Sequence, residues 1–130
     1  MFLSKRYSRS IGRLTLVSWL TLALSPAFAA DLPVGSYTAE GHTLTLTLDA
    51  SGRFRVIEKD LVQVSGRYTV KGDQIELTDT DGPWACTKAG QQTGTYHWML
   101  GKSVLTFSKV ADPCEDRVGS LVKVGWKQKS

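Results

Sequence analysis

From Ser36 onward, apolar and polar residues alternate with a period of two over most of the chain. The clearest run is Thr-Leu-Thr-Leu-Thr-Leu at 43–48, in which the leucines share one face and the threonines the other. A turn-forming Asp-Ala-Ser-Gly segment at 49–52 leads into 53–56, where Phe54 and Val56 face inward and two arginines face outward. These two runs predict a half-buried antiparallel hairpin.

The alternation continues in 61–70, 74–78, 94–100 and 104–108, with turn residues between the runs. Gly66 lies in the middle of its run and indicates a bulge or a sharp bend. A strand around Tyr37 and a last strand near 118–126 bring the expected count to about eight. No segment shows a clear helical period of 3.6 residues.

Eight short strands joined by tight turns have two simple arrangements, a closed up-and-down barrel and a two-sheet sandwich. Successive hairpins favour a meander, and closing the meander removes the unpaired edges that promote aggregation. We therefore predict an all-β fold, a single small antiparallel up-and-down β-barrel of about eight strands. The interior of such a barrel holds side chains or one small ligand.

The first 29 residues have the pattern of a signal peptide. A basic head with Lys5, Arg6, Arg9 and Arg13 precedes an apolar run at 14–24 and the small-residue sequence Ala-Phe-Ala at 27–29. Cleavage before Ala30 would leave one domain at 30–130, with no membrane anchor in the mature form. We expect this form to be periplasmic or secreted.

The formal charge of +4 depends entirely on this leader. Of the 16 Lys and Arg residues, four lie in 1–29, whereas all 12 Asp and Glu residues follow it. The mature chain therefore carries 12 basic and 12 acidic residues and is neutral. Without a surplus of positive charge, nucleic acid is not an expected partner.

Cys86 and Cys114 are the two cysteines of the chain. An even pair in an exported domain of about 100 residues indicates a disulfide. The loop-entropy model gives roughly 3.5 kcal/mol for a ring of about 29 residues. The competing interpretations are a free reactive thiol and a metal pair, for which His42 and His97 are the available histidines.

Three blocks of sequence resemble small exported bacterial lipocalin-like proteins of the calycin type. They are the Gly35-Ser36-Tyr37 opening, the Ser-Gly-x-Tyr strand with a Gly-Asp turn at 65–73, and a Gly-x-Tyr-x-Trp … Asp-x-Cys-x-x-Arg pattern at 94–117. The resemblance implies a non-enzymatic barrel with an internal site for a small apolar molecule. It also implies structural roles for Gly35 and Tyr37.

The sequence contains little catalytic chemistry, and we do not expect an enzyme. His42 lies in a turn-like segment, and His97 points to the face opposite Tyr96 and Trp98, so no motif supplies a catalytic triad. Three aspartates at 73, 79 and 81 lack the spacing of a calcium loop and are interpreted as turn residues. No metal site and no cofactor are predicted.

Aromatic side chains are the better candidates for binding. If the barrel encloses a cavity, Tyr68, Tyr96 and Trp98 would line it, although core packing is the simpler interpretation. Trp84 lies in the long irregular stretch at 79–92 and is a candidate for protein contact, a lid or a loop residue packed on the barrel end. Arg117 is expected to be structural, capping the barrel end and stacking over a ring.

Two functions follow as hypotheses. The first is an exported barrel that binds a small apolar ligand in its interior. The alternative is a protein-binding module of the envelope that inhibits lysozyme or a secreted protease, with an envelope or secreted protein as its partner. Residues 65–68 resemble a lysozyme-inhibitor strand but are one residue short of its Ser-Gly-x-x-Tyr spacing.

Overall fold

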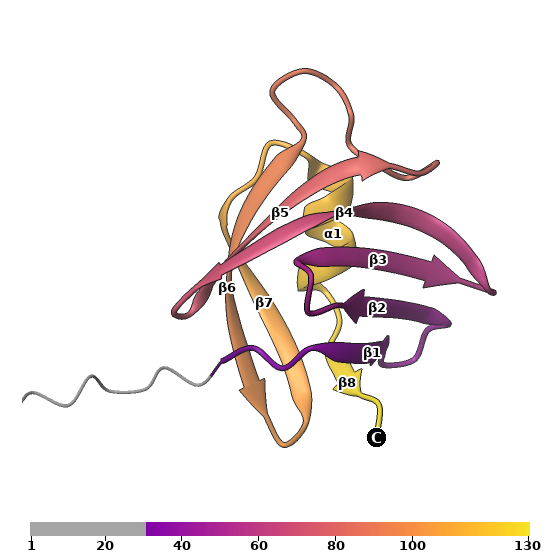
Figure 1. Cartoon of the computed structure of the whole chain (residues 1–130), viewed down its shortest axis with the longest axis vertical. Helices are drawn as coiled ribbons and strands as arrows, with labels where there is room; N and C mark the ends of the chain where they lie inside the picture. The colour runs from indigo at the N-terminus through magenta and orange to yellow at the C-terminus, as the bar shows by residue number, and fades with distance from the viewer. Residues whose placement is uncertain (1–30) are drawn as a thin grey trace, which may run out of the picture.

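The computed structural model describes residues 31–130 as a closed antiparallel barrel in which each strand pairs with the next and β8 returns to β1 (Figure 1). The signal-peptide prediction at 1–29 lies outside the described residues. Between β7 and β8 the chain forms one short helix. The elements are β1 Gly35–Ala39, β2 Leu44–Leu48, β3 Arg53–Glu58, β4 Leu61–Lys71, β5 Gln74–Asp81, β6 Thr93–Gly101, β7 Val104–Ala111, α1 Glu115–Val122 and β8 Trp126–Gln128.

The predicted up-and-down barrel is thus confirmed, and the sandwich alternative is wrong. Register follows the alternation of the sequence: Leu46 pairs with Val56 and Leu48 with Phe54 across β2 and β3. Because side chains alternate between the two faces of a strand, this register places all four apolar side chains on the same inner face.

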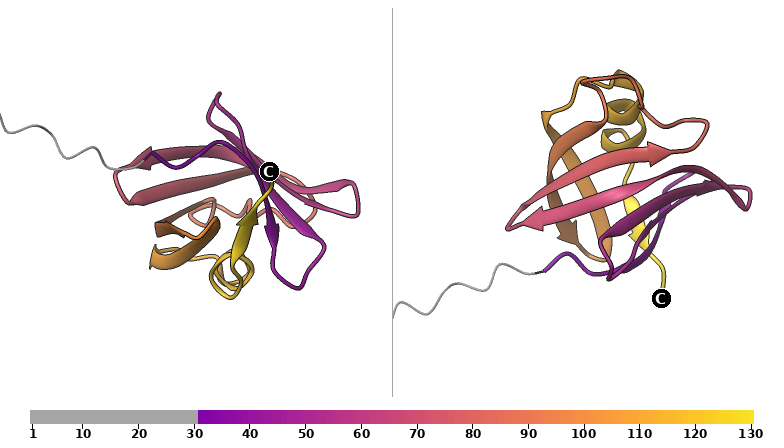
Figure 2. Two further views of the ribbon diagram at one scale, coloured as in Figure 1. Left: turned by 90° about the horizontal axis from the view of Figure 1, so that it is seen from below. Right: turned by 45° about the horizontal axis from the view of Figure 1, so that its top comes forward.

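Gly66 lies at a bulge, as its position in the sequence predicted. The pairing of β4 with β5 shifts register between Ser65 and Gly66. A Cβ atom at position 66 would overlap the backbone of Thr78 and the ring of Phe54. Glycine therefore allows the close approach of β4 to Thr78 and Phe54 at this bulge. β4 curves along the wall of the barrel (Figure 2).

The strand expected near 118–126 is wrong, because 115–122 is helical and β8 starts only at Trp126. The two buried residues of α1, Arg117 and Leu121, are four positions apart and face the barrel together. One of them is charged, so the buried side of the helix gives no apolar pattern in the sequence. Beyond Val104 and Leu105, β7 has no pairing with β8, and α1 packs against β7 instead.

Aromatic rings fill the middle of the barrel. Tyr37, Tyr96 and Trp126 have no exposed surface, and neither do Ile75 and Leu105. The Tyr96 and Phe107 rings meet edge to face with their centroids 6.3 Å apart. Burial of this kind is the main favourable contribution to folding, at roughly 1.5–3 kcal/mol for each large apolar side chain.

The two ends of the barrel differ. The loop end carries the β1–β2, β3–β4 and β5–β6 connections and the start of α1, which runs from there toward β8 (Figures 1 and 2). The hairpin end carries the tight β2–β3, β4–β5 and β6–β7 turns together with residues 31–34, where Leu32 packs into the core. Within 31–130, the single helix is too short to cross a membrane.

Candidate functional site

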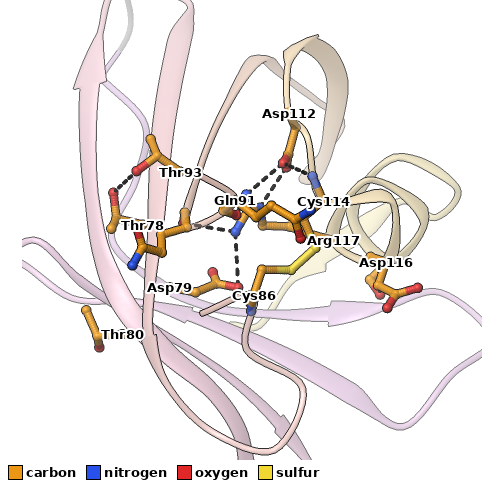
Figure 3. A network of polar contacts seen from close by, with 12 residues as sticks. Thr78, Asp79, Thr80, Cys86, Gln91, Thr93, Asp112, Cys114, Asp116 and Arg117 are labelled. Atoms are coloured by element: carbon orange, nitrogen blue, oxygen red, sulfur yellow. Dashed lines mark hydrogen bonds and ion pairs between the residues drawn. A yellow bond between two sulfur atoms is a disulfide. The ribbon is translucent and has the colours of Figure 1, made fainter. Parts of the chain in front are cut away.

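The loop end is built on a buried ion network centred on Arg117 (Figure 3). The guanidinium donates from Nε to Oδ2 of Asp112 at 2.7 Å and from Nη2 to Oδ1 at 2.6 Å. Its Nη1 lies 3.1 Å from Oδ2 of Asp79. All three side chains are at least nine-tenths buried. The bidentate pair with Asp112 uses the planar fork that distinguishes arginine from lysine.

Arg117 is therefore placed at the barrel end, as expected, but its partners among residues 31–130 are carboxylates and backbone carbonyls and not the face of a ring. In addition to the two aspartates, it donates to the carbonyl oxygens of Gln91 at 2.9 Å and Gln92 at 3.0 Å. The side chain thus ties the end of the β5–β6 loop to α1.

The network shifts the pKa values of its members. Burial opposes ionisation of Asp112, but hydrogen bonds from Arg117, Tyr96 and the Cys114 amide outweigh it and hold the pKa of Asp112 below its ordinary value. Burial likewise works against the charged form of Arg117, yet its bonds to Asp112 raise its pKa. Burial and the hydrogen bond that Tyr96 donates to Asp112 raise the pKa of the Tyr96 hydroxyl.

Gly94 and Cys114 help to position this network. A Cβ atom at Gly94 would overlap the Asp112 carboxylate, so the glycine of the Gly-x-Tyr-x-Trp block admits the ion pair. The backbone amide of Cys114 donates to Asp112 Oδ1 at 2.8 Å and fixes the turn into α1. The Asp-x-Cys-x-x-Arg spacing thus brings the aspartate and arginine together through one turn of helix.

Asp79 corrects one sequence interpretation, since it is a buried residue of β5 and not a turn residue. Its Oδ2 accepts the Cys86 amide at 2.8 Å and pairs with Arg117, whereas its Oδ1 has no hydrogen-bond partner among the described residues. With Asp112, it places two carboxylates around one guanidinium. Asp79 therefore holds the middle of the β5–β6 loop, as Arg117 holds its end.

The predicted disulfide between Cys86 and Cys114 is confirmed, with a Cα–Cα distance of 6.4 Å. It joins the β5–β6 loop to the residue that precedes α1. At the start of the loop, the Trp84 amide donates to the Gln63 carbonyl of β4 at 3.0 Å. The loop is consequently fixed at its beginning, middle and end, although its residues are mostly exposed.

Trp84 is 49% exposed on this fixed loop. Leu61 and Val62, at the start of β4 and directly before the Gln63 that Trp84 contacts, are 66% and 42% exposed. We refer to Leu61, Val62 and Trp84 as the Trp84 patch. Its three members are among the large apolar residues that the described chain leaves exposed, and they come from elements held together by a backbone hydrogen bond.

The three predicted ligand-binding residues do not converge on a common space. Tyr96 is fully buried and its hydroxyl bonds to Asp112 toward the loop end. Tyr68 and Trp98 are half-buried at the hairpin end, where the Tyr68 hydroxyl donates to the Asp49 carbonyl at 2.5 Å and Trp98 Nε1 to the Gly72 carbonyl at 2.9 Å. Their polar tips therefore hold the turns of that end.

The Gly35-Ser36-Tyr37 motif also stabilises the hairpin end. Tyr37 is fully buried, and its hydroxyl donates to the Pro33 carbonyl at 2.5 Å. Gly35 begins β1 with φ at +137°, which side-chain-bearing residues rarely adopt. Together they direct residues 31–34 across the hairpin end, where Leu32 is buried.

Two hollows of the described chain lie on the outside of the barrel. The fully buried inner side chains have no accessible surface, so no water-sized space adjoins them. One hollow of about 520 Å³ lies on the outer face of β3 and β4, and another of about 560 Å³ lies open beside the β1–β2 turn.

Both histidines of residues 31–130 are exposed. His97 is exposed on the outer face of β6, with Nδ1 3.4 Å from Asp73 Oδ2, and His42 is exposed in the β1–β2 turn. Among residues 31–130, no three His, Cys, Asp or Glu side chains gather closely enough to hold a metal ion. The two buried aspartates already have the guanidinium of Arg117 as their cation.

No family model, curated protein or solved structure matches this chain.

Proposed function

We propose that this protein is an exported, non-enzymatic binding module of the lipocalin-like barrel type that acts by contacting another exported protein through the Trp84 patch. The observation that carries the proposal is a half-exposed tryptophan on a loop with several anchors. Tryptophan is among the residues most enriched in the energetic centres of protein interfaces.

The anchoring of the loop supports a binding role for Trp84. Ordering a surface loop costs conformational entropy, and burying Asp79, Asp112 and Arg117 costs desolvation energy. Hydrogen bonds from this network reach Cys86, Gln91 and Gln92, so the buried charges hold an exposed segment in place. A loop ordered in advance avoids the entropy loss that otherwise weakens association.

Two further exposed apolar residues lie on β4, next in sequence to the Gln63 that accepts the Trp84 amide. Leu61 and Val62 follow the β3–β4 turn, whose Lys59 and Asp60 both have positive φ values and are exposed. Exposed apolar residues together with nearby charged residues match the composition of a small protein interface. Inhibition of lysozyme or of a secreted protease is the form of this activity that the sequence suggests.

Photocrosslinking tests the proposal in the cells that make the protein. A photoreactive amino acid placed at Trp84 is expected to give one discrete adduct with an exported protein. The same group at Met99, which is 71% exposed on β6, is the matched control and is expected to give none. Equal labelling from both positions, or no adduct from position 84, would contradict the proposal.

Enzyme assays then test the inhibitor form directly. The purified protein is expected to slow lysozyme or a secreted protease at micromolar concentration, and Trp84→Ala is expected to weaken inhibition about tenfold or more. Met99→Ala should inhibit like the wild type. A wild-type protein that slows neither enzyme would exclude inhibition and leave the crosslinked partner to define another binding role.

A second candidate is binding of a small apolar molecule, and the half-buried Tyr68 and Trp98 at the hairpin end favour it. Because the middle of the barrel is filled, such a ligand would lie at this end, against the two rings. Native mass spectrometry of protein purified from its own cells tests this candidate. A retained small molecule that is lost in Trp98→Ala would support it, and a protein of bare sequence mass would contradict it.

A further inference from the structure

The outer face of β3 and β4 carries three arginines that the binding role of the loop end does not use. Arg53 and Arg55 both point outward from β3, and Arg67 points outward from β4. Arg53 and Arg67 are direct partners in the strand register, and Arg55 pairs with Ser65. We refer to Arg53, Arg55 and Arg67 as the arginine face.

Like charges placed directly opposite across two strands destabilise a sheet. Among residues 31–130, none of the three guanidiniums has a carboxylate within ion-pair distance, since the three ion pairs found involve His97 and Arg117. Three arginines that repel one another and form no ion pair among residues 31–130 are suited to an anionic ligand. Residues 30–130 have equal numbers of basic and acidic residues, so this cluster of positive charge does not follow from the overall composition.

The arginine face surrounds a hollow. About 520 Å³ of space is lined by the three arginines together with Ser65, Thr80, Asp49, Phe54 and the backbone of Gly66. The β-bulge at Ser65 and Gly66 lies at this hollow, and both residues are part of its lining. Guanidinium and hydroxyl groups therefore line the same concave surface.

Asp49 is the one carboxylate in this lining, and its side chain is hydrogen-bonded within the β2–β3 turn. Its Oδ1 accepts hydrogen bonds from the Ser51 hydroxyl at 2.7 Å, the Arg53 amide at 2.9 Å and the Ser51 amide at 3.0 Å. These hydrogen bonds, led by that of the Ser51 hydroxyl, hold the pKa of Asp49 below its ordinary value. The hollow thus has three positive charges and one negative charge.

We propose that the arginine face is a binding site for a phosphate group. A phosphomonoester carries a charge of about −1.5 to −2 near pH 7 and three strong acceptor oxygens, which matches a net local charge of two and several forked donors. A single carboxylate carries half that charge and two oxygens. The phosphate group has two sources, a free phosphorylated molecule and the headgroup of a lipid.

Titration of the full-length mature protein with inorganic phosphate, at constant ionic strength, tests the proposal. Arginine Nε–Hε signals of Arg53, Arg55 and Arg67 and the amide of Gly66 are expected to shift together and to saturate in the NMR spectrum. Shifts spread over basic residues elsewhere, or no saturable shift at these four positions, would overturn the site.

Arg67→Gln is expected to weaken phosphate binding about tenfold or more, because a hydrogen-bonded charge is removed from the hollow. Lys109→Gln removes the same charge from an exposed position on β7, outside the hollow, and is expected to change the affinity less than twofold. Equal loss in both variants would mean that binding follows overall charge, which overturns the proposal. Both changes are at exposed positions, and thermal unfolding of each variant verifies that it folds.

Two further probes separate the sources and the competing chemistry. Binding to phosphatidylcholine vesicles that contain phosphatidic acid, but not to phosphatidylcholine alone, would identify a lipid headgroup; binding of inorganic phosphate without vesicle binding would identify a free molecule. A polyglutamate peptide that displaces phosphate and binds more tightly would show that the site takes acidic protein segments, which contradicts the proposal. None of these measurements involves the Trp84 patch, so their failure is distinguishable from failure of the proposed function.

Discussion

Arg117 and Asp112 form a bidentate ion pair, with both side chains buried, at the point where the β5–β6 loop, β7 and α1 meet. The pair connects the exposed loop to the barrel core, because Arg117 also holds two loop carbonyls and Asp112 also accepts the Tyr96 hydroxyl. Its loss would therefore affect both the stability of the fold and the order of the loop.

Asp112→Asn is expected to lower the free energy of unfolding by about 3–5 kcal/mol at neutral pH, because it removes one of the two carboxylates that neutralise a buried guanidinium. Urea denaturation measures the change. Asp116→Asn, at an exposed position in the first turn of α1, is the control and should cost less than about 1 kcal/mol. Equal effects of the two substitutions would show that the buried pair contributes nothing particular to stability.

The same ion pair makes the stability of the fold depend on pH in acidic solution. Because the pKa of Asp112 is lower in the folded protein than its ordinary value of 3.8, its contribution is present above that value and is lost as the pH falls below it through the folded pKa. Denaturation midpoints measured from pH 5 downward should fall less steeply for Asp112→Asn than for the wild type. Parallel curves would contradict this assignment.

For Tyr96 we predict a loss of stability in alkaline solution instead. Its pKa is raised above 10.0 by burial and by its bond to Asp112, so its contribution is complete below pH 10 and is lost as the pH rises further. Tyr96→Phe is expected to cost about 1.5–3 kcal/mol at neutral pH, since the hydroxyl bonds a charged group. It should also reduce, but not abolish, the loss of stability above pH 10, because the pKa values of Tyr37 and Tyr68 are raised as well.

Much of the fold was predictable because the buried face of each strand is regular in the sequence. Inward residues such as Leu46, Phe54 and Ile75 stand every second position, and the turns between runs contain Gly, Asp or Ser. The pairing of Cys86 with Cys114 required only their number and an oxidising compartment. The local alternation of apolar and polar residues was thus sufficient to predict seven of the eight strands.

The helix was not predicted because its signal is short and partly charged. Only Arg117 and Leu121 are buried within its eight residues, and its N-cap residue, Cys114, makes no side-chain capping bond. The acidic residues Glu115 and Asp116 in the first turn were the available indication. A charged residue on the buried side of so short a helix is explained only by partners from other elements.

The site was predicted less well than the fold. Asp79 is far from Asp112 and Arg117 along the chain, and only the closed barrel brings it to the guanidinium. Asp112 and Arg117 are only five positions apart. The Asp-x-Cys-x-x-Arg pattern identified Asp112 and Arg117 as a block, although not as an ion pair. Tyr68 and Trp98 were correctly expected to face inward, but sequence does not reveal that backbone carbonyls would satisfy their polar tips.

The disulfide gives a further prediction. Replacing both cysteines by serine is expected to lower the free energy of unfolding by up to roughly 3.5 kcal/mol, because the unfolded chain regains the freedom of the cross-linked ring. The barrel should still form, since its ion network does not involve the sulfur atoms. Hydrogen exchange should accelerate at Cys86 and its neighbours but remain slow at Asp79, whose amide donates to Gln92. Uniform acceleration over the barrel would contradict this division.

Arg67→Gln is expected to stabilise the free protein by about 0.5 kcal/mol, because it removes the like charge opposite Arg53. Arg55→Gln provides the control, since Arg55 faces Thr47 and Ser65 and should change stability little. Urea denaturation at low and high salt measures both, and the gain for Arg67→Gln should shrink as salt screens the repulsion. A loss of stability at low salt would show that the two guanidiniums do not repel each other.

The strand that joins the ends of the meander has only three residues, and it connects β1 to β7. In a chain that emerges amino end first from a ribosome or a translocation channel, β1 to β7 can pair in sequence while β1 and β7 still lack β8 between them. β1 can pair with its second neighbour only after residues 126–128 have emerged, and the pairing of Tyr37 with Gln128 joins positions 91 residues apart. Until β8 has formed, β1 and β7 are unpaired edges that can pair with other copies of the chain, and residues 126–128 end this exposure.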